Sequence, residues 1–527
     1  MTGYPILSLL VLAPLAGAVA ILAVRGDRPE TVRRIALAAM AVTAVLAAQA
    51  FDAFVPGEPG YQFTESRTWI PSLGVGWRLG ADGAALLMIA LTALLSPVAL
   101  IASWRSVEKR VREYAVALLV LESAMIGVFA SLDLLLFYVF WEVMLVPMAL
   151  LIGIWGGDRR VHASMKFFLY TVVGSFPMFL AILYVWNVQV RAGHATFDVA
   201  TLAASLPLQL SATEQFWLFL AFALAFAIKV PLFPLHTWLP DAHVQAPTAG
   251  SVILAGVLLK MGAFGFLRYA IPFFPQAATA CAGPILALAV AGILYGALMA
   301  LAQDDLKKMI AYSSVSHLGF VMLGLFTFTT QGVSGAILQM VNHGLSTGAL
   351  FLLVGVLYDR AHRRGIDDFG GLARTMPVFA VALVLTTMSS VAMPGLNGFV
   401  GEFLVLAGTF RVHRYAAAAA GLAMILGAVY MLSAVRRILY GPAHRADTAA
   451  MPDLARRERV ALAPLAAGFV VLGLWPNLLL DRIEPDVRRF LERRAAMIRH
   501  ADAGPAPGTG RRIRVAERPA PAGEARR

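Results

Sequence analysis

Seven ionisable side chains lie near the centres of long apolar stretches, where charged groups are rare. They comprise acids, bases and imidazoles: Glu122, Glu142, Lys229, Lys260, His317, His343 and Glu402. On insertion scales, placing one lysine or aspartate at the centre of a membrane helix costs about 2.5–3.5 kcal/mol of free energy. Seven such groups are therefore a large cost for a merely structural protein, and groups of these types can take up and release protons. Any single one, a lone histidine above all, can equally be satisfied in a structural helix contact.

The two central lysines are the most informative of the seven. Only six of the 43 basic residues are lysine, yet two of the six, Lys229 and Lys260, lie inside apolar blocks. Burial favours the neutral form of lysine, so a buried lysine can lose its proton. A nearby carboxylate favours the protonated ammonium form. Arginine stays protonated and cannot do this. The choice of lysine therefore favours a proton relay.

The composition places these residues in a membrane protein. Of the 527 residues, 59% are apolar and 14% are charged. One cysteine, Cys281, excludes a disulfide framework, a cysteine-ligated zinc site and a self-contained iron–sulfur cluster. Because no Walker sequence or dinucleotide fingerprint is present either, we expect no cofactor in this chain. The net charge of +12 comes from short loops and the C-terminal tail, which is typical of a topology signal and not of nucleic-acid binding.

Hydropathy windows of about 19 residues predict an all-α integral membrane protein with fourteen spans. The first span has no basic segment before it, so we interpret it as a retained helix. The predicted spans are 5–24, 35–51, 82–103, 114–131, 132–154, 164–187, 214–239, 249–270, 282–302, 309–328, 332–358, 376–411, 415–435 and 459–479.

Two of these spans are interrupted by helix-breaking residues, at 229–234 and at 394–398. A break frees backbone groups that survive in a membrane only where protein or water satisfies them. The broken spans are five apart and so run in opposite directions, which favours two inverted five-helix repeats. Two unrelated proline kinks are the alternative. The predicted units are helices 1–3 (1–113), the first repeat (114–270), the second repeat (280–440), helix 14 (441–480) and a basic, disordered tail (481–527).

Arg and Lys gather in the loops after the odd-numbered spans, so all of these loops lie on one side. By the positive-inside rule that side is cytoplasmic, which places both termini on the periplasmic side of a bacterial inner membrane. The arginine-rich tail then falls on the wrong side, so either it comes too late to matter or one span is miscounted.

Three long motifs carry a resemblance to a known family: residues 141–147, residues 236–243 running on to Lys260, and residues 309–317. They resemble the proton-conducting, antiporter-like membrane subunits of respiratory complex I, over about residues 80–440. Glu402, in the second broken helix, resembles the subunit M, or chain 4, type, because sister subunits tend to have lysine there. The resemblance implies fourteen helices with two inverted repeats.

The resemblance also implies a role for individual residues. Glu142 would be the carboxylate partner of Lys229, and Lys260 the central connecting lysine. His317 and His343 would lie on the polar axis towards Glu402, the terminal proton carrier. His236, beside the first break, would join the cytoplasmic input route.

The resemblance assigns no clear role to Glu122, which we keep as a supporting candidate. The implied function is proton translocation within a proton-pumping NADH:quinone oxidoreductase. NADH, flavin, iron–sulfur clusters and quinone would be bound by partner subunits, among them sister antiporter-like subunits. A subunit of a multi-subunit cation/proton antiporter and a membrane subunit of a hydrogenase or formate-oxidising complex remain alternatives, as does a scaffold without transport activity.

Overall fold

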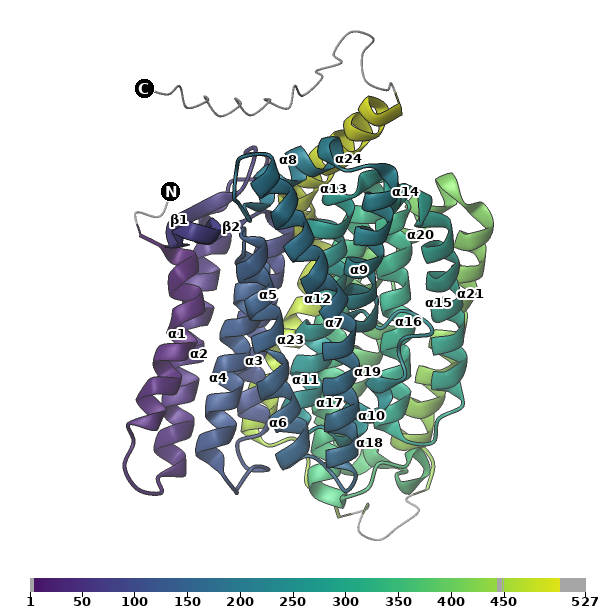
Figure 1. Cartoon of the computed structure of the whole chain (residues 1–527). Helices are drawn as coiled ribbons and strands as arrows, with labels where there is room; N and C mark the ends of the chain where they lie inside the picture. Colours follow the sequence, from purple (N-terminus) through teal and green to yellow (C-terminus); the bar gives the residue numbers. More distant parts are fainter. Residues whose placement is uncertain (1–3, 443–447, 449, 503–527) are drawn as a thin grey trace, which may run out of the picture.

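The computed structural model describes residues 4–442, 448 and 450–502, and its long helices lie side by side in one bundle (Figure 1). The elements of the first half are α1 (Ile6–Leu22), α2 (Pro29–Ala53), β1 (Gln62–Ile70), η1 (Pro71–Leu73), β2 (Val75–Ala81), α3 (Gly83–Ala102), α4 (Val111–Ala130), α5 (Leu134–Val143), α6 (Leu145–Trp155), α7 (Arg160–Arg191), α8 (Val199–Gln209), α9 (Ala212–Lys229), α10 (Trp238–Gln245), α11 (Thr248–Ile253), η2 (Leu254–Leu258), α12 (Leu259–Gly265), η3 (Phe266–Ala270) and α13 (Ile271–Phe273).

The second half follows the same pattern of long helices joined by short connections. Its elements are α14 (Pro275–Ala280), α15 (Ala282–Leu301), α16 (Leu306–Phe326), α17 (Thr330–Ala361), η4 (Ile366–Asp368), α18 (Leu372–Thr375), α19 (Pro377–Ser390), α20 (Asn397–Val412), α21 (Arg414–Leu439), α23 (Arg456–Leu474) and α24 (Asn477–Asp502).

The predicted helical membrane architecture is confirmed. The count of fourteen membrane-spanning helices stays a prediction. Within the described residues, 11 helices are long and apolar enough to cross a membrane, or up to 12 if the bent pair α23 and α24 forms one span. Three expected spans fall outside the count of 11. Helix α1 has only 17 residues, the span at 376–411 is split into α19 and α20, and α23 passes only together with α24.

The interior of the bundle is formed by α17 and by the run from α11 to α13, whose most apolar windows are completely buried. In α2, α7 and α21 only a minority of the most apolar window is buried, so these helices form part of the outer surface. An α-helix that is buried on all sides presents polar residues only to other helices. Polar groups on α17 therefore lie in the protein interior and not against lipid.

A β-hairpin connects α2 to α3, a region to which the span prediction assigned no element. Strands β1 and β2 pair antiparallel, and the hairpin lies at the same end of the bundle as α8 (Figure 1). The carboxylate of Asp133, at the start of α5, accepts a hydrogen bond from the Gly76 backbone N–H and pairs with Arg78 at 2.9 Å. These contacts attach the hairpin to the helices beneath it.

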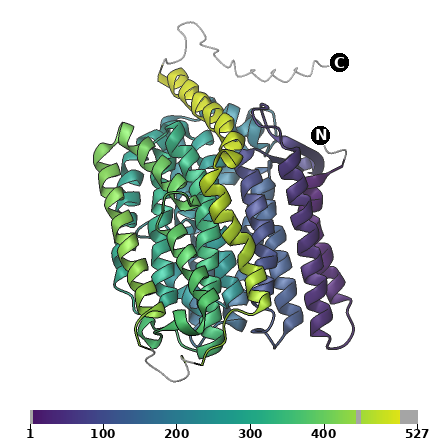
Figure 2. The ribbon, with the colours of Figure 1, turned by 180° about the vertical axis from the view of Figure 1, so that it is seen from behind.

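The predicted tail was wrong in its first part, because residues 481–502 belong to helix α24. Figure 2 shows α23, in yellow-green, along the back of the bundle and α24, in yellow, rising from its upper end. The two helices are bent by 66° relative to each other. Ile483 and Val487 are buried against the bundle, so apolar residues at helical spacing order this segment in spite of its many arginines. Residues 503–527, the rest of the predicted tail, lie outside the described residues.

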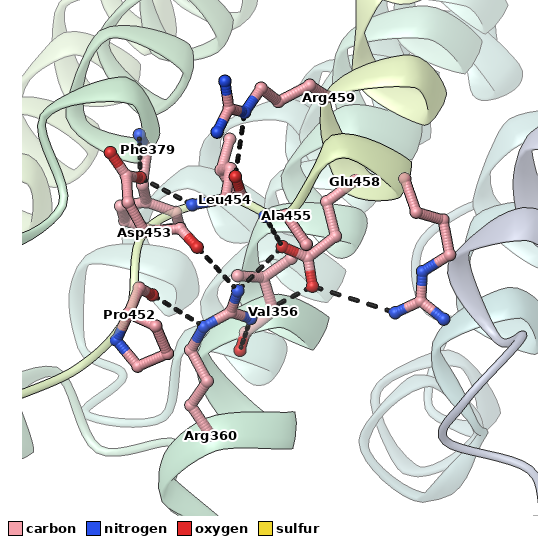
Figure 3. A network of polar contacts seen from close by, with 10 residues as sticks. Val356, Arg360, Phe379, Pro452, Asp453, Leu454, Ala455, Glu458 and Arg459 are labelled. Carbon is pink, nitrogen blue, oxygen red and sulfur yellow. Dashed lines mark hydrogen bonds and ion pairs between the residues drawn. The ribbon is translucent and has the colours of Figure 1, made fainter.

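A polar network joins the end of α17 to the segment before α23 (Figure 3). Arg360 donates to both carboxylate oxygens of Glu458, at 3.1 and 2.7 Å, and to the backbone oxygens of Val356, Pro452 and Asp453. An arginine with this many acceptors is held in one orientation. The network therefore anchors the end of the central helix.

Asp453 has a separate part in this network, at the beginning of α19. Its carboxylate accepts from the backbone N–H groups of Val378, Phe379 and Leu454. Burial raises the pKa of the Asp453 carboxyl, but these amide donors outweigh it and leave the pKa below its usual value. The ionised carboxylate thereby satisfies two of the free N–H groups in the first turn of α19.

Candidate functional site

Lys260 and His343 are in direct contact in the interior of the bundle. Lys260 is completely buried on α12, and His343 is 2% exposed on α17. The lysine Nζ lies 2.6 Å from Nδ1 of His343 and also donates to the backbone oxygen of Ala255. A protonated lysine can only donate hydrogen bonds, so His343 Nδ1 accepts the hydrogen bond from the Lys260 ammonium. The central lysine thus has a titratable partner within hydrogen-bond distance.

His317 and Glu402 form the second direct contact. Nδ1 of His317, on α16, lies 2.7 Å from Oε1 of Glu402, on α20, and Gln339 on α17 donates to the same oxygen at 3.0 Å. The ring centroids of His317 and His343 are 5.6 Å apart. Lys260, His343, His317 and Glu402 therefore form one row across four helices, and hereafter we call these four residues the buried row.

The backbone around Lys260 is modified on both sides. Helix α12 lies between two five-residue π-helical stretches, η2 and η3. Single π-turns inside α-helices are frequent at functional sites because they re-aim side chains. Here the first π-turn places the backbone oxygen of Ala255 against the Lys260 ammonium.

Glycines allow α17 to approach this segment closely. A Cβ at Gly344 would lie 2.8 Å from the backbone oxygen of Gly256, in η2, and 2.7 Å from the Leu91 side chain. Real Cβ atoms avoid contacts this short, so the approach requires glycine at position 344. Since Gly344 follows His343 directly, this approach sets the distance between His343 and Lys260.

The second helix break precedes α20, the helix that carries Glu402, and buried side-chain hydrogen bonds hold Asn397, the first residue of α20. Asn342 donates to the backbone oxygen of Asn397 at 2.6 Å, and Ser389 donates to the side-chain oxygen of Asn397 at 2.6 Å. These bonds tie the start of α20 to α17 and α19 in the buried interior. The break holds the start of α20 against α17 and so positions Glu402 beside Gln339.

The first half of the molecule carries Glu142 and Lys229. Glu142, near the end of α5, is half-buried and accepts a hydrogen bond of 2.5 Å from Ser175 on α7. Lys229, the last residue of α9, is 1% exposed, and its Nζ has no hydrogen-bond partner among the described residues. It lies 5.3 Å from the ring centroid of Trp141. Lys229 and Glu142 form no ion pair in the described part of the chain.

The first break follows Lys229 directly and leads to His236. The Trp238 indole donates to the backbone oxygen of Ile228 at 3.0 Å, which satisfies one of the carbonyls that the break frees. His236 is 3% exposed and lies among aromatic rings, with centroids at 5.7 Å for Phe233 and 5.0 Å for Tyr295. It is therefore beside the break, as the motif predicts, but in an aromatic environment.

Glu122 lies apart from the other candidates. It is fully buried on α4, and neither carboxylate oxygen has a hydrogen-bond partner among the described residues. Helix α4 packs mainly on α1, α3 and α5, on the side of the bundle away from α20. No contact within the described residues joins Glu122 to the buried row, so its candidacy rests on burial alone.

Two buried residues near the row were missed by sequence reasoning. His243 is fully buried on α10, with its ring stacked at 4.6 Å on Phe351 and both ring nitrogens unpartnered among the described residues. Lys307, assigned to a loop from the sequence, is 5% exposed, and its Nζ donates to the backbone oxygen of Ala246 at 2.8 Å. The rarity of lysine could have pointed to Lys307. The position of His243 within the motif at 236–243 was the only signal for it.

The arrangement suits proton transfer between side chains. Donor and acceptor atoms at 2.6–3.2 Å are within the range in which a proton can pass along a hydrogen bond. The described residues contain no group of three or more His, Cys, Asp or Glu side chains that could hold a metal ion. The residue types and the contacts of 2.6 and 2.7 Å in the buried row fit acid–base chemistry.

Comparison with known proteins agrees with this geometry. Residues 131–427 match the family model described as NADH:quinone oxidoreductase/Mrp antiporter, TM. A relative from Rhodobacter capsulatus named NADH-quinone oxidoreductase subunit M is 47% identical over 459 residues, which cover 85% of this chain and 87% of the relative.

Solved structures show the same fold. A chain of respiratory complex I from Thermus thermophilus with bound NADH has a TM-score of 0.84 and 34% identity, covering 93% of this chain and 99% of that chain. A chain of the Mrp complex from Dietzia sp. has a TM-score of 0.82 at 22% identity, covering 94% and 99%, which shows a shared fold only. By the family match and the 47% identity, this chain belongs to the family of NADH:quinone oxidoreductase and Mrp antiporter membrane subunits.

Proposed function

We propose that the chain is a proton-translocating membrane subunit of an NADH:quinone oxidoreductase. The 47% identity to a subunit M and the 34% identity to a complex I chain support the oxidoreductase. NADH oxidation and quinone reduction belong to partner subunits in this proposal. The sister antiporter-like subunits would be its neighbours in the membrane.

The buried row carries the proposed activity. A proton on Lys260 passes to His343, then to His317, and leaves through Glu402, the terminal carrier. The contacts of 2.6 Å at one end of the row and 2.7 Å at the other are the main support. The transfer between the two imidazoles, whose centroids are 5.6 Å apart, is the step that needs a ring movement or a bridging water.

Glu142 and Lys229 control the input side in this proposal. When the Glu142 carboxylate approaches Lys229, it favours the protonated form of the lysine. When the carboxylate moves away, the buried lysine releases its proton towards Lys260. At about 6 Å and an effective dielectric constant near 20, one charge changes the energy of another by about 3 kcal/mol. His236 and His243 line the approach between the first break and Lys260, and Glu122 stays a supporting candidate.

The proposed topology has two inverted repeats, at 114–270 and 280–440, each with one broken helix. Each break adjoins a helix that carries an ionisable member of the path: Lys229 is the last residue of α9, before the first break, and Glu402 lies on α20, after the second. In a bacterial inner membrane, the ends of the chain would face the periplasm. Moving one charge against the membrane potential requires about 2.3 kcal/mol per 100 mV, so the energy must come from the partner subunits.

The complex purified with its native partners and reconstituted into proteoliposomes tests this function. We expect NADH-driven quinone reduction to be coupled to proton uptake, and replacement of Lys260 to abolish the contribution of this chain. An antiporter would instead move Na⁺ or another cation against protons without NADH. Cation-driven proton exchange in place of NADH-driven pumping would overturn the proposal.

A further inference from the structure

A cavity of about 440 Å³ lies at the end of the bundle that carries the β-hairpin, away from the buried row. It is bounded by α24, by α8, by the residues before β1 and by the segment η3–α13. Neither the family motifs nor the proposed proton path uses these residues. The lining combines charged and apolar side chains.

The charged lining is predominantly positive. Four arginines line the cavity, Arg268, Arg489, Arg493 and Arg494, and the acids that line it are Asp82 and Asp486. Two positive charges are therefore left without a counter-charge from the lining. An arginine cluster in a concave site is suited to a phosphate or another oxyanion, which the guanidinium fork can bind through two parallel hydrogen bonds.

Arg268 is the member of this cluster that points most clearly to a ligand. It is 4% exposed, and its guanidinium lies between the rings of Tyr61 and Phe264, at 4.8 and 4.9 Å from their centroids. Its Nη2 lies 2.6 Å from Asp82, but its Nη1 has no hydrogen-bond partner within the described residues. A buried donor left unpaired is costly, and an anion in the cavity would satisfy it.

The second acid of the lining is already engaged elsewhere. Asp486 accepts from the Gly83 backbone N–H at 2.8 Å and pairs with Arg489 at 2.5 Å. Arg489 in turn donates to the backbone oxygens of Gly57 and Glu58. Asp486 and Arg489 therefore hold α24 against the hairpin end. The two lining charges without a counter-charge are those of Arg493 and Arg494, and Arg268, paired with Asp82, adds its unpartnered Nη1 donor.

The rest of the lining is apolar, which favours an anion with an apolar body over a simple inorganic ion. Small side chains of α8, Ala200, Ala203 and Ala204, face the apolar side of α24, where Ile483 and Val487 lie. A ligand with an acidic head and an apolar body complements both parts. We propose that this cavity binds the phosphate headgroup of an acidic phospholipid, with its glycerol and upper acyl chains against α8 and α24.

Photolabelling of the purified complex tests the site. The complex is placed in phosphatidylcholine nanodiscs that contain a small fraction of phosphatidylglycerol with a photoreactive group beside the glycerol, or of the matched photoreactive phosphatidylcholine. Peptide mass spectrometry then locates the adducts. We expect phosphatidylglycerol, and not phosphatidylcholine, to label α8 and α24.

The variant Arg493→Gln removes an exposed charge from the lining and should lower this labelling about fivefold, the effect expected for one arginine near an anionic headgroup. Arg268→Gln should lower it further, and Arg499→Gln, on the same helix but outside the cavity, should not change it. If Arg268→Gln fails to assemble, Arg493→Gln still decides the question. Equal labelling in Arg493→Gln and Arg499→Gln, or equal labelling by the two lipids, would overturn the proposal. Binding of inorganic phosphate to the complex that Arg493→Gln weakens, with no phosphatidylglycerol adduct on α8 or α24, would overturn the lipid in favour of a free anion.

Discussion

The Nζ atom of Lys260 lies 2.6 Å from Nδ1 of His343, although the two residues are 83 positions apart in the chain. The contact depends on the π-helical stretch before α12 and on the glycines that let α17 approach it. It joins a residue of the predicted first repeat to one of the second. The hydrogen bond between Lys260 and His343 therefore connects the two halves of the proposed path.

The first prediction concerns the two central lysines. Lys229→Arg and Lys260→Arg keep the positive charge but cannot release a proton, so we expect both to pump as poorly as the corresponding alanine variants. Positioned acid–base groups typically contribute about 10²–10⁴-fold, so the loss should exceed about tenfold. Proton uptake by proteoliposomes with matched complex content measures it. Lys109→Arg, in an exposed loop, is the control. Near wild-type pumping by the two arginine variants would show that the lysines only hold charge.

The second prediction concerns the input side. Glu142→Ala should remove proton pumping and most of the coupled quinone reductase activity while leaving the complex assembled, because the lysine then has no carboxylate to respond to. Ser175→Ala, which removes the 2.5 Å hydrogen bond to Glu142, should give a partial loss. Glu113→Ala, which affects an exposed pair with Arg110, should behave like wild type. Pumping by a fully assembled Glu142→Ala complex at the normal rate would contradict the assignment.

The third prediction concerns the end of the path. Glu402→Gln keeps the shape and the hydrogen bonds to His317 and Gln339 but cannot ionise, so we expect it to block pumping strongly. Glu402→Asp should keep partial activity. Glu402→Lys, which can still titrate, should be tolerated better than glutamine. NADH-driven quinone reduction and proton uptake are measured together. If the glutamine variant pumps normally, the terminal carrier lies elsewhere.

The fourth prediction tests the close approach of α17. In Gly344→Ala the new Cβ would lie 2.8 Å from the Gly256 backbone oxygen, so α17 must move and His343 moves away from Lys260. Overpacking of this kind costs about 1–3 kcal/mol, and we expect pumping to fall more than complex content. Gly348→Ala, on the same helix, places its Cβ at an ordinary 3.5 Å from Leu95 and is the control. Equal pumping by the two variants would argue against the role of this approach.

The fifth prediction concerns stability at the end of α17. Arg360→Lys cannot make the two parallel bonds to Glu458 and the bonds to Pro452 and Asp453 at once. Because hydrogen bonds to charged groups contribute about 1.5–3 kcal/mol each, the melting temperature of the complex should fall. The number of protons pumped per electron should not change. Arg34→Lys, at an exposed site on α2, should leave the melting temperature unchanged. A lowered proton-to-electron ratio in Arg360→Lys would instead place Arg360 in the path.

The sequence by itself determined the membrane class, the position of the long helices, the two breaks and the ionisable residues inside the spans. Hydropathy reports these features because each depends on residues that are close together in the chain. Long motifs at residues 141–147, 236–243 and 309–317 also identified the family, which the comparisons confirm.

Only the tertiary structure decided which ionisable groups meet. It joined Lys260 to His343 and His317 to Glu402, placed Glu122 on its own, and buried Lys307, because these relationships depend on how distant helices pack. It also ordered residues 481–502 as a helix, since the apolar side of α24 is stabilised by the bundle and not by its own composition. Local sequence records which residues enter the membrane, and helix packing determines which of them can exchange a proton.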